Sequence, residues 1–424
     1  MLDLKFIREN VDQVRANADA RRIPIQLDQL LTLAQERLRL VADVQEIHRQ
    51  QNEVARLTKQ AKTDDERAPL ITKGRELKAE LEAKNSLASK VEADTVELQR
   101  HIPNLTHPDV PRGDENITLR EVLPKPAFDF KPLDHVSLCE RLGLADFEKA
   151  AKVTGSSFYY LKGDGVLLEQ ALINFAIRTL VAEGFTPVTT PDLARTSILE
   201  GTGYMPRGPE TQIYTVANSD LCLIATAEIT LAGMFADEII EVDDLPIRLA
   251  GLSHCFRTEA GAAGRATKGL YRVHQFTKVE MFEFTTPEQS EATHQKLLAI
   301  EERIFQGLEI PYRVIDTCVS DLGGPAYRKY DLEAWMPGRG EAGEWGEVTS
   351  TSNCTDYQAR RLNIRFKVPG QKGTQFVHML NGTAVATARA IVALLENHQQ
   401  ADGSIRIPAV LIPYMGKDHI VGNK

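Results

Sequence analysis

The chain has 424 residues, of which 42% are hydrophobic and 26% are charged, and its formal net charge is -9 at pH 7. These values are typical of an ordinary globular protein with room for two or three domains. The negative balance argues against general coating of nucleic acid, although it is compatible with a local basic surface.

The N-terminal sequence, MLDLKFIRENVDQVR, contains acidic residues and lacks a continuous apolar core. We therefore expect neither a signal peptide nor a transit peptide. No run approaches the roughly 18–20 apolar residues that a membrane helix requires. The five cysteines lie far apart without a CxxC pair, which indicates a reducing compartment. The sequence thus predicts a cytoplasmic protein with no membrane contact and no structural zinc.

Two long helices are predicted next. Between about residue 30 and residue 61 there is no proline or glycine, and apolar residues recur at alternating spacings of three and four. A second run repeats this pattern up to residue 98. The two seams consist of Leu33, Leu40, Val44, Ile47 and Val54, and of Leu70, Leu77, Leu81, Ala88, Val91 and Leu98. The segment KTDDERAP supplies a turn, so we expect an antiparallel hairpin; a dimerisation coiled coil is the alternative.

This helical arm, placed at residues 1–105, has too little core to be a catalytic domain. At about 1.5 Å per residue, some thirty residues extend roughly 45 Å. The exposed Lys and Arg side chains, interleaved with acids, are typical of a solvated surface. They would also suit phosphate contacts if they cluster on one side.

A stretch rich in proline and glycine, HIPNLTHPDVPRGDEN, then begins a linker and the start of the catalytic domain at residues 106–165. Residues 166–424 have a mixed pattern. The expected helices are LLEQALINFAIRTLVAE and TAVATARAIVALLENHQ, the expected strands are LPIRLAGLSHCFR, LYRVHQFTKVEMFEF, YRKYDLEAWM and EVTSTSN, and GGPAY at Gly323 is an expected turn. Because the strands arrive as hairpins, we expect an α+β fold in which helices flank an antiparallel sheet.

Charged residues on the predicted strands are the main chemical signal, since GxxxxGK[ST], strand-bound GxGxxG, HExxH and GxSxG motifs are absent from the sequence. Strand alternation places Arg257 and Glu259 on one face of the first run. It likewise places Phe276, Lys278 and Glu280 on one face of the second run. These side chains face either solvent or a ligand.

Three further residues are candidates for binding phosphate or metal. Arg389 lies in the last predicted helix on an alanine-rich, apolar surface, where an arginine is costly unless it is paired. Its partner is either a bound phosphate or a nearby carboxylate. Glu347 and Ser350 offer hard oxygen ligands to magnesium, although such residues on a strand are also common at a protein surface.

Several separate motifs resemble those of one enzyme family. The run CFRTEAGAAGRATKGLYRVHQFTKVEMF, near 252–284, resembles motif 2 of class II aminoacyl-tRNA synthetases in the form found in seryl-tRNA synthetases. EGFTPVTTP, near 183–192, resembles motif 1, and LNGTAVATARAIVALLENHQ, near 380–396, resembles motif 3. TAE at 226–228 is similar to the serine-binding tripeptide, and MLDLKFIREN is similar to the start of the bacterial-type tRNA-binding arm.

The resemblance covers essentially the whole chain and implies a homodimer with an antiparallel class II catalytic sheet. The implied reaction joins ATP and L-serine to give seryl-adenylate, and then transfers serine to the 3′ end of tRNA(Ser). Whether tRNA(Sec) is a second acceptor stays open. The implied substrate complex is ATP with Mg2+, and no tightly bound organic cofactor is expected.

The resemblance also implies a set of site residues. The catalytic residues are Arg257 and Arg389. ATP would be bound by Arg257, Thr258, Glu259, Val273, Phe276, Glu347, Val348, Thr349, Ser350 and Arg389. Serine would be bound by Thr226, Ala227, Glu228, Arg257, Glu280, Asn381 and Thr383, and Mg2+ by Glu347 and Ser350 through ATP. The serine carboxylate itself would attack phosphorus, so the protein would act by positioning and charge neutralisation.

The chain departs from the family pattern at a few positions. It has Ala266 and Lys268 where an acid and an arginine are usual, and Thr349 and Thr351 where bacterial members commonly have serine and cysteine. The loop PGRGEAGEWG is also unusual. Two other functions remain open: a paralogue that loads a small amino acid onto a carrier protein or another acceptor, and a non-catalytic dimeric paralogue.

Overall fold

The computed structural model describes residues 1–204, 212–259 and 269–422. These residues form two compact units, Met1–Leu105 and Thr106–Lys424, each with its own core. Ala266 and Lys268, singled out in the sequence, lie outside the described residues.

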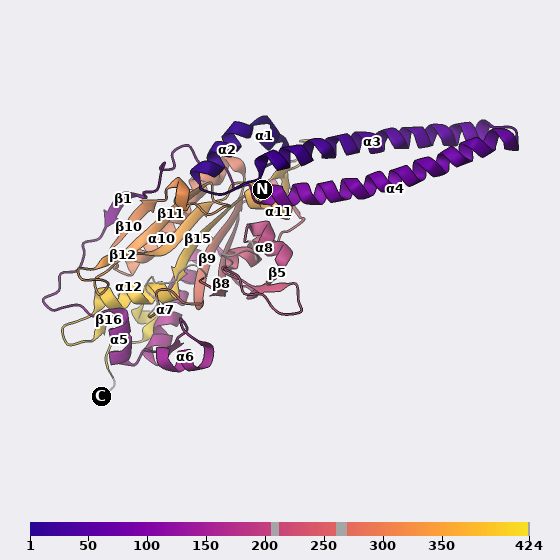
Figure 1. The fold of residues 1–424 in the computed structure, drawn as a ribbon. Coiled ribbons are helices and arrows are strands. Elements are labelled where there is room, and N and C mark those ends of the chain that lie inside the picture. Colours follow the sequence, from indigo (N-terminus) through magenta and orange to yellow (C-terminus); the bar gives the residue numbers. More distant parts are fainter. Residues whose placement is uncertain (205–211, 260–268, 423–424) are drawn as a thin grey trace. The chain divides into compact units, whose positions relative to one another are not determined.

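The first unit is a helical hairpin with a small base. Its helices are α1 (Leu4–Glu9), α2 (Val11–Ala20), α3 (Leu27–Gln60) and α4 (Asp64–Arg100), and α3 and α4 run antiparallel along their length (Figure 1). Leu40 and Ile47 of α3 and Leu77 and Val91 of α4 are buried, and the other predicted seam residues are at least half-buried. This arrangement confirms the intramolecular hairpin.

The turn of the hairpin is shorter than the sequence suggested. Thr63 and Glu66 form a capping box in which each side chain binds the other residue's backbone N–H, at 3.3 Å in both directions. This cap starts α4 at Asp64, so Pro69 lies inside the helix rather than in the turn. Pro69 is the sixth residue of α4, beyond the first turn, so the helix gives up the hydrogen bond that a backbone N–H would make there to the Asp65 carbonyl oxygen.

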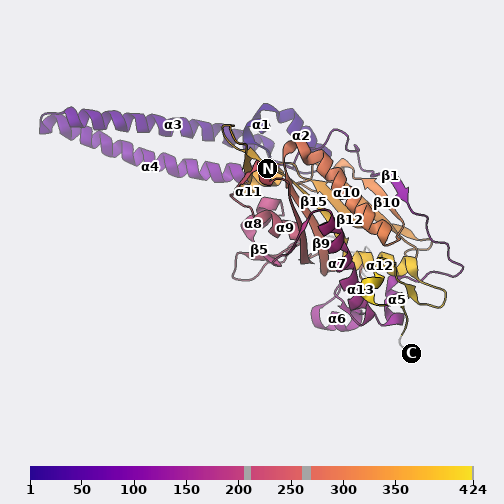
Figure 2. The same cartoon turned by 180° about the vertical axis from the view of Figure 1, so that it is seen from behind.

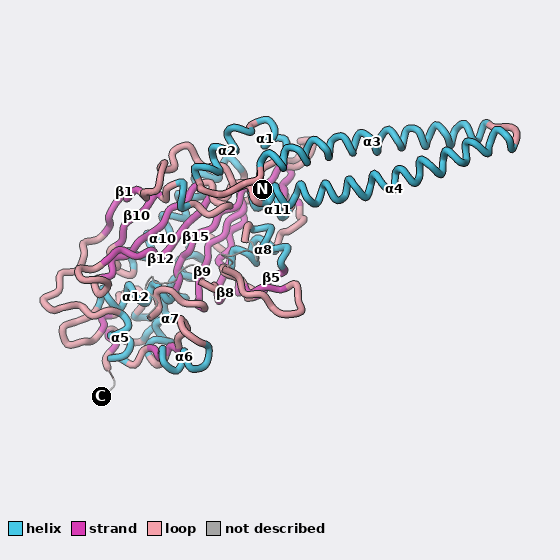
Figure 3. Tube along the Cα trace, viewed as in Figure 1, coloured by secondary structure: helices cyan, strands magenta, loops and turns pink. Residues whose placement is uncertain are grey.

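The second unit is built on an eight-stranded sheet with the order β1-β10-β11-β12-β15-β9-β8-β4. Figure 3 shows strands of this sheet in magenta, among them β10, β12, β15 and β9. Its strands are β1 (Ile117–Val122), β4 (Thr186–Thr189), β8 (Ile247–Phe256), β9 (Gln275–Thr285), β10 (Tyr312–Asp316), β11 (Arg328–Met336), β12 (Glu344–Asn353) and β15 (His378–Ala386). Neighbouring strands are antiparallel except β4 and β8, which are parallel. The expected α+β fold is confirmed.

Helix α10 (Ser290–Gly307) covers one face of this sheet (Figure 2). Thr293 donates to Glu283 of β9 at 3.3 Å, and Thr349 of β12 donates to Glu301 at 2.9 Å. Since successive strand residues point to opposite faces, the residues next to Glu283 and Thr349 in sequence turn away from α10. That opposite face carries the cavity described below.

The remaining elements surround the sheet. The helices are α5 (His135–Leu142), α6 (Phe147–Thr154), α7 (Asp164–Ala182), α8 (Thr196–Thr202), α9 (Ala227–Gly233), α11 (Tyr357–Leu362), α12 (Thr387–His398) and α13 (Ile412–Met415), with 3-10 turns at Val242–Asp244, Pro287–Gln289 and Val319–Asp321. Short strands form small sheets: β2 (Ala145–Asp146) with β3 (Tyr160–Leu161), β5 (Leu193–Arg195) with β6 (Leu221–Leu223), β7 (Ile239–Glu241) with β13 (Arg365–Lys367) and β14 (Gln375–Phe376), and β16 (Ile405–Arg406) with β17 (His419–Ile420).

Two features differ from the sequence-based predictions. Helix α7 has 19 residues and a mean hydropathy of 1.4, so by length and composition alone it is apolar enough to span a membrane, which the sequence analysis did not anticipate. A core helix of a soluble protein passes the same test. In addition, the last predicted helix begins later, at Thr387, because the residues before it pair with β9 as strand β15. Tertiary pairing there overrides the helix propensity of alanine.

Candidate active site

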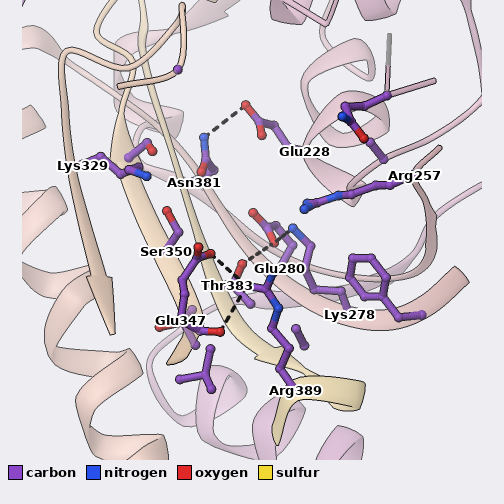
Figure 4. A pocket seen from close by; sticks show the side chains of 18 of the residues that line it. Glu228, Arg257, Lys278, Glu280, Lys329, Glu347, Ser350, Asn381, Thr383 and Arg389 are labelled. Carbon is purple, nitrogen blue, oxygen red and sulfur yellow. Dashed lines mark hydrogen bonds and ion pairs between the residues drawn. The ribbon is translucent and has the colours of Figure 1, made fainter. Parts of the chain in front are cut away.

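The second unit contains a cavity of about 840 Å³ on the sheet face opposite α10. Its lining comes from the segment after β8, from β9, β11, β12 and β15, and from the first turns of α9 and α12 (Figure 4). Most of the residues singled out from the sequence meet here. The lining includes Glu228, Arg257, Glu259, Val273, Phe276, Glu280, Glu347, Val348, Thr349, Ser350, Asn381, Thr383 and Arg389.

Arg257 and Glu259 lie beyond the end of β8, which corrects their predicted place within a strand. The strand ends at Phe256, and Glu259 has a φ of 51°, in the left-handed region that interrupts an extended chain. One further backbone bond, from Arg257 N to His274 O at 2.9 Å, holds this segment against the chain entering β9. Arg272, predicted in the same strand as Phe276, likewise precedes β9, and its guanidinium binds Glu259 at 2.9 Å.

A planar aromatic surface lies beside the Arg257 side chain. The guanidinium carbon of Arg257 lies 5.3 Å from the centre of the Phe276 ring, a cation–π distance. Among the described residues, no carboxylate lies within ion-pair distance of Arg257. This guanidinium is therefore available to an anionic ligand.

Arg389 projects from the first turn of α12 toward β12. Its Nη1 lies 3.0 Å from Glu347 Oε1 and 3.1 Å from the Glu347 carbonyl oxygen. Burial raises the pKa of Glu347, but the charges of Arg389, Lys329 and Arg257 outweigh it and lower the pKa. Of the two partners expected for Arg389, the structure contains the carboxylate.

The ring of Tyr271 supports Arg389 from the side. The guanidinium carbons of Arg389 and Arg339 lie 5.0 Å and 4.4 Å from the ring centre, and the Tyr271 hydroxyl donates to Glu347 O at 3.2 Å. Arg339 belongs to the loop that looked unusual in the sequence, so this loop supports the position of the cavity arginine.

A β-bulge in β12 brings Glu347 and Ser350 onto the same side. Leu332 pairs with Thr349 and Glu333 pairs with Glu347, so Val348 is an extra residue in the ladder. In a regular strand, residues three apart point to opposite faces. The extra residue removes this mismatch, and both Glu347 and Ser350 line the cavity.

Glu228 lies on the opposite side of the cavity and receives neutral hydrogen-bond donors. Asn381 Nδ2 lies 3.1 Å from its Oε1 (Figure 4). Gln358 Nε2 lies 2.7 Å from the same oxygen, and the Tyr204 hydroxyl lies 3.3 Å from its Oε2. Among the described residues, no cationic group lies within ion-pair distance of Glu228. Burial raises the pKa of this carboxyl to about 7. A ligand ammonium would supply the charge that Glu228 lacks.

Three predicted residues do not line the cavity. Thr226 caps α9, and its Oγ1 accepts from Glu228 N at 3.3 Å and from Lys278 Nζ at 2.8 Å. Ala227 packs beneath β8, where its Cβ would lie 2.9 Å from a Cβ added at Gly251. Thr258 donates its backbone N–H to Gln212 O at 3.1 Å.

Comparison with known proteins places the chain in a family. Residues 214–398 match the family described as tRNA synthetase class II core domain (G, H, P, S and T), and residues 1–106 match the seryl-tRNA synthetase N-terminal domain. A serine–tRNA ligase of Rhodopirellula baltica is 58% identical over 421 residues, covering 99% of each chain. The chain belongs to the seryl-tRNA synthetase family. A serine–tRNA ligase of Rubrobacter xylanophilus is 53% identical, again over 99% of each chain.

Solved structures of the seryl-tRNA synthetase family also match over the full length. The enzyme of Pyrococcus horikoshii complexed with ATP has a TM-score of 0.93 and 42% identity, covering 100% of both chains. The cytoplasmic ligase of Naegleria fowleri in complex with AMP has a TM-score of 0.88 and 30% identity, covering 100% of this chain and 99% of that one.

Several cavity residues of this family member were missed from the sequence. Lys278 was placed on the correct face of β9 but received no role. Lys329 of β11, Tyr204 and Tyr271 also line the cavity, and Gln358 reaches Glu228 from α11. The alternation of side chains along β11 is a sequence pattern that could have identified Lys329 as a cavity residue. Tyr204 and Gln358 follow from tertiary placement alone.

Proposed function

We propose that this chain activates L-serine with ATP and transfers serine to the 3′ end of tRNA(Ser). The single observation that carries the proposal is the pair of unmatched charges in the cavity, Arg257 and Glu228. An amino acid has one carboxylate and one ammonium, which complement these two side chains. Whether tRNA(Sec) is a second acceptor is decided by charging assays with both tRNAs.

The nucleotide would lie along the Phe276 and Arg389 side of the cavity. Phe276 stacks the adenine ring, and Glu259 accepts from its exocyclic amine, with Thr258 and Val273 beside it. Arg257 binds the α-phosphate and the serine carboxylate, and Arg389 binds the γ-phosphate. The Oε1 atom of Glu347 lies 3.0 Å from Arg389 Nη1, so the two side chains would face the phosphates together.

Mg2+ fits the residues at the β12 bulge. Glu347 has a lowered pKa and Ser350 supplies a hydroxyl, and both line the same wall of the cavity. Two hard oxygen ligands together with phosphates are what Mg2+ uses in nucleotide sites. When bound, the ion neutralises phosphate charge, and Val348 and Thr349 complete the wall beside it.

Serine would lie between α9, β9 and β15. Glu228 holds its ammonium, supported by Thr226, Ala227 and Asn381, while Glu280 and Thr383 accept and donate at its hydroxyl. The bound carboxylate attacks the α-phosphorus directly, so Arg257 needs only to align the reacting groups and disperse charge. No proton has to be removed from a protein nucleophile.

We further propose a cytoplasmic homodimer. Val166, Leu167 and Val181 are exposed on the apolar helix α7, which supports burial of this surface by a second copy. Light scattering on Leu167→Lys tests this proposal, and a variant that keeps the mass of the wild-type assembly would contradict it.

The deciding experiment measures serine-dependent ATP–pyrophosphate exchange and then charging of tRNA(Ser). The proposal requires both activities. Exchange without charging would favour the paralogue that loads a carrier protein. Absence of exchange with every amino acid would favour the non-catalytic paralogue.

A further inference from the structure

Lys278 is a buried lysine in the floor of the cavity. It lies on β9 two residues before Glu280, on the same strand face, and its side chain is 6% exposed. Nζ forms an ion pair with Glu280 (Figure 4) and donates to Thr226 Oγ1 at 2.8 Å. Burying an ammonium costs several kcal/mol unless such partners satisfy it, so its place here depends on these two contacts.

The contacts of Glu280 are distributed unevenly over its two oxygens. Among the described residues, the ion pair with Lys278 and the 3.3 Å hydrogen bond from Thr383 Oγ1 both end at Oε2. An ionised carboxylate accepts hydrogen bonds at both oxygens and donates none. Oε1 is therefore the atom that can accept a hydroxyl from a ligand in the cavity.

Two other buried carboxyls near the cavity floor, Glu228 and Glu301, differ from Glu280 in their contacts. Burial raises the pKa of Glu228 to about 7 and that of Glu301, beneath the sheet, well above its ordinary value. Neither has an ammonium in contact among the described residues, whereas Glu280 does. Lys278 thus gives Glu280 an ammonium partner that the other two carboxyls lack.

Lys278 also connects the two parts of the cavity that would hold an amino acid. Thr226, its second partner, caps the helix α9 that carries Glu228. The lysine therefore bridges the helix with the ammonium acceptor and the strand with the hydroxyl acceptor. The length of the lysine side chain between Thr226 and Glu280 therefore sets the distance between the ammonium acceptor on α9 and the hydroxyl acceptor on β9.

We infer that Lys278 is a positioning residue that determines side-chain specificity, because it fixes Oε2 of Glu280 and leaves Oε1 aimed at the substrate hydroxyl. The inference rests on the proposed serine activation. It assigns the choice of serine over alanine to the Lys278–Glu280 pair rather than to Glu280 alone. Alanine would leave Oε1 without a donor, which is the costly outcome for a buried carboxylate.

The test uses Lys278→Met in the full-length chain and measures kcat/KM for serine-dependent and alanine-dependent pyrophosphate exchange. We expect the serine value to fall about 100-fold and the alanine value by less than about fivefold, so that the ratio collapses. Equal losses for both amino acids would overturn the inference. Failure of the wild-type chain to use serine would instead overturn the proposed function.

A matched control is Lys329→Met, which removes a half-buried lysine of the cavity, paired with Asp331 at 3.1 Å. We expect it to change exchange with serine and alanine in the same proportion. A collapse of the serine-to-alanine ratio in Lys329→Met as well would mean that any loss of charge in the cavity has this effect, and would also overturn the inference.

A double-mutant comparison separates action through Glu280 from direct contact with substrate. In a Glu280→Gln background, Lys278→Met should change the serine-to-alanine ratio by less than about twofold, because the residue through which it acts is already altered. The same large drop in both backgrounds would contradict the inference. If Lys278→Met alone fails to fold by circular dichroism, the double variant removes both charges and the comparison with Glu280→Gln still decides.

Discussion

At the scale of single residues, the cavity is organised by which charges already have partners. Lys278 contacts Glu280, Arg272 contacts Glu259 and Arg389 contacts Glu347, whereas Arg257 and Glu228 are unmatched among the described residues. Exposed ion pairs contribute little free energy, but in a buried site a missing partner is costly. The two unmatched groups therefore favour a ligand with charges of both signs.

Glu228 should make serine binding depend on pH. Only the ionised carboxylate holds an ammonium, and its pKa is about 7, so protonation below this pH removes the attraction. We expect KM for serine to rise as the pH falls, by up to about tenfold per unit below pH 7. Pyrophosphate-exchange assays between about pH 5.5 and pH 8.5 measure this dependence of KM on pH. Glu228→Gln should show a high KM that does not vary with pH, and a flat wild-type profile would contradict the assignment.

Tyr271 should act on ATP through Arg389. Tyr271→Leu removes both the ring beneath the guanidinium and the hydroxyl that binds Glu347 O. We expect KM for ATP to rise about five- to tenfold, from the loss of one cation–π contact and one hydrogen bond. Tyr271→Phe keeps the ring and should cost about threefold or less. Equal effects of the two variants would assign the role to the hydroxyl alone.

Individual residues also show how much of the site could be predicted from the sequence. Thr226, Glu228, Arg257 and Phe276 follow from motifs that are local in sequence, and the resemblance to the family supplied their roles. Gln358 does not follow, because it reaches Glu228 from 130 positions away through the packing of α11 on α8 and α9. Short-range patterns carry no signal for such a contact.

At the scale of elements, one carboxylate joins three segments around the cavity. Glu396 of α12 accepts from His135 N, from His135 Nδ1 and from Gly338 N, each at 3.0 Å. Because the Nδ1–H of His135 donates to Glu396, its Nε2 can accept from Leu270 N at 3.2 Å. The helix α12 thereby holds the chain that leads from residue 269 into β9.

Glu396→Gln should loosen these segments. The amide offers one acceptor oxygen in place of two, which leaves at least one buried N–H without its partner. We expect the free energy of unfolding to fall by about 1–3 kcal/mol, and KM for ATP to rise. Urea denaturation and exchange assays measure the two effects. Glu309→Gln, which removes a half-exposed partner of Arg406, is the control and should cost less than about 1 kcal/mol.

Element boundaries were the least predictable part of the fold. Long helices such as α3 and α4 were predicted correctly because the apolar seam along each of them repeats many times. The predicted start of α12 was wrong because the alanine-rich segment before it pairs with β9. The predicted strand at β8 continued too far because Glu259 adopts a positive φ. Both outcomes depend on neighbours that are distant in sequence.

At the scale of the whole molecule, the arm and the second unit have separate hydrophobic cores. The base of the arm is closed by Leu2, Ile7, Val14, Leu27, Leu30 and Ile102. Each unit therefore has the packing to fold without the other, which supports a division of labour between tRNA binding and amino-acid activation.

Removal of the arm should separate the two half-reactions. We expect replacement of residues 30–98 by a short glycine linker to leave serine-dependent exchange within about twofold of wild type, because no cavity residue comes from this segment. Charging of tRNA(Ser) should fall by at least about 100-fold if the arm supplies most contacts with the RNA. A parallel loss of exchange would show that the arm is required by the catalytic core.

The extra residue at Val348 constrains how the chain can change. Deleting one residue between Glu347 and Ser350 removes the bulge and leaves these two residues two apart, a spacing at which a regular strand still points both side chains to one face. Both functional side chains of the wall for ATP would be kept, although Val348 or Thr349 would be lost from it. In β12, the extra residue and the three-residue spacing thus compensate for each other, and mutational scans that include single-residue deletions should find this short segment more tolerant of one deletion than the regular ladder on either side of it.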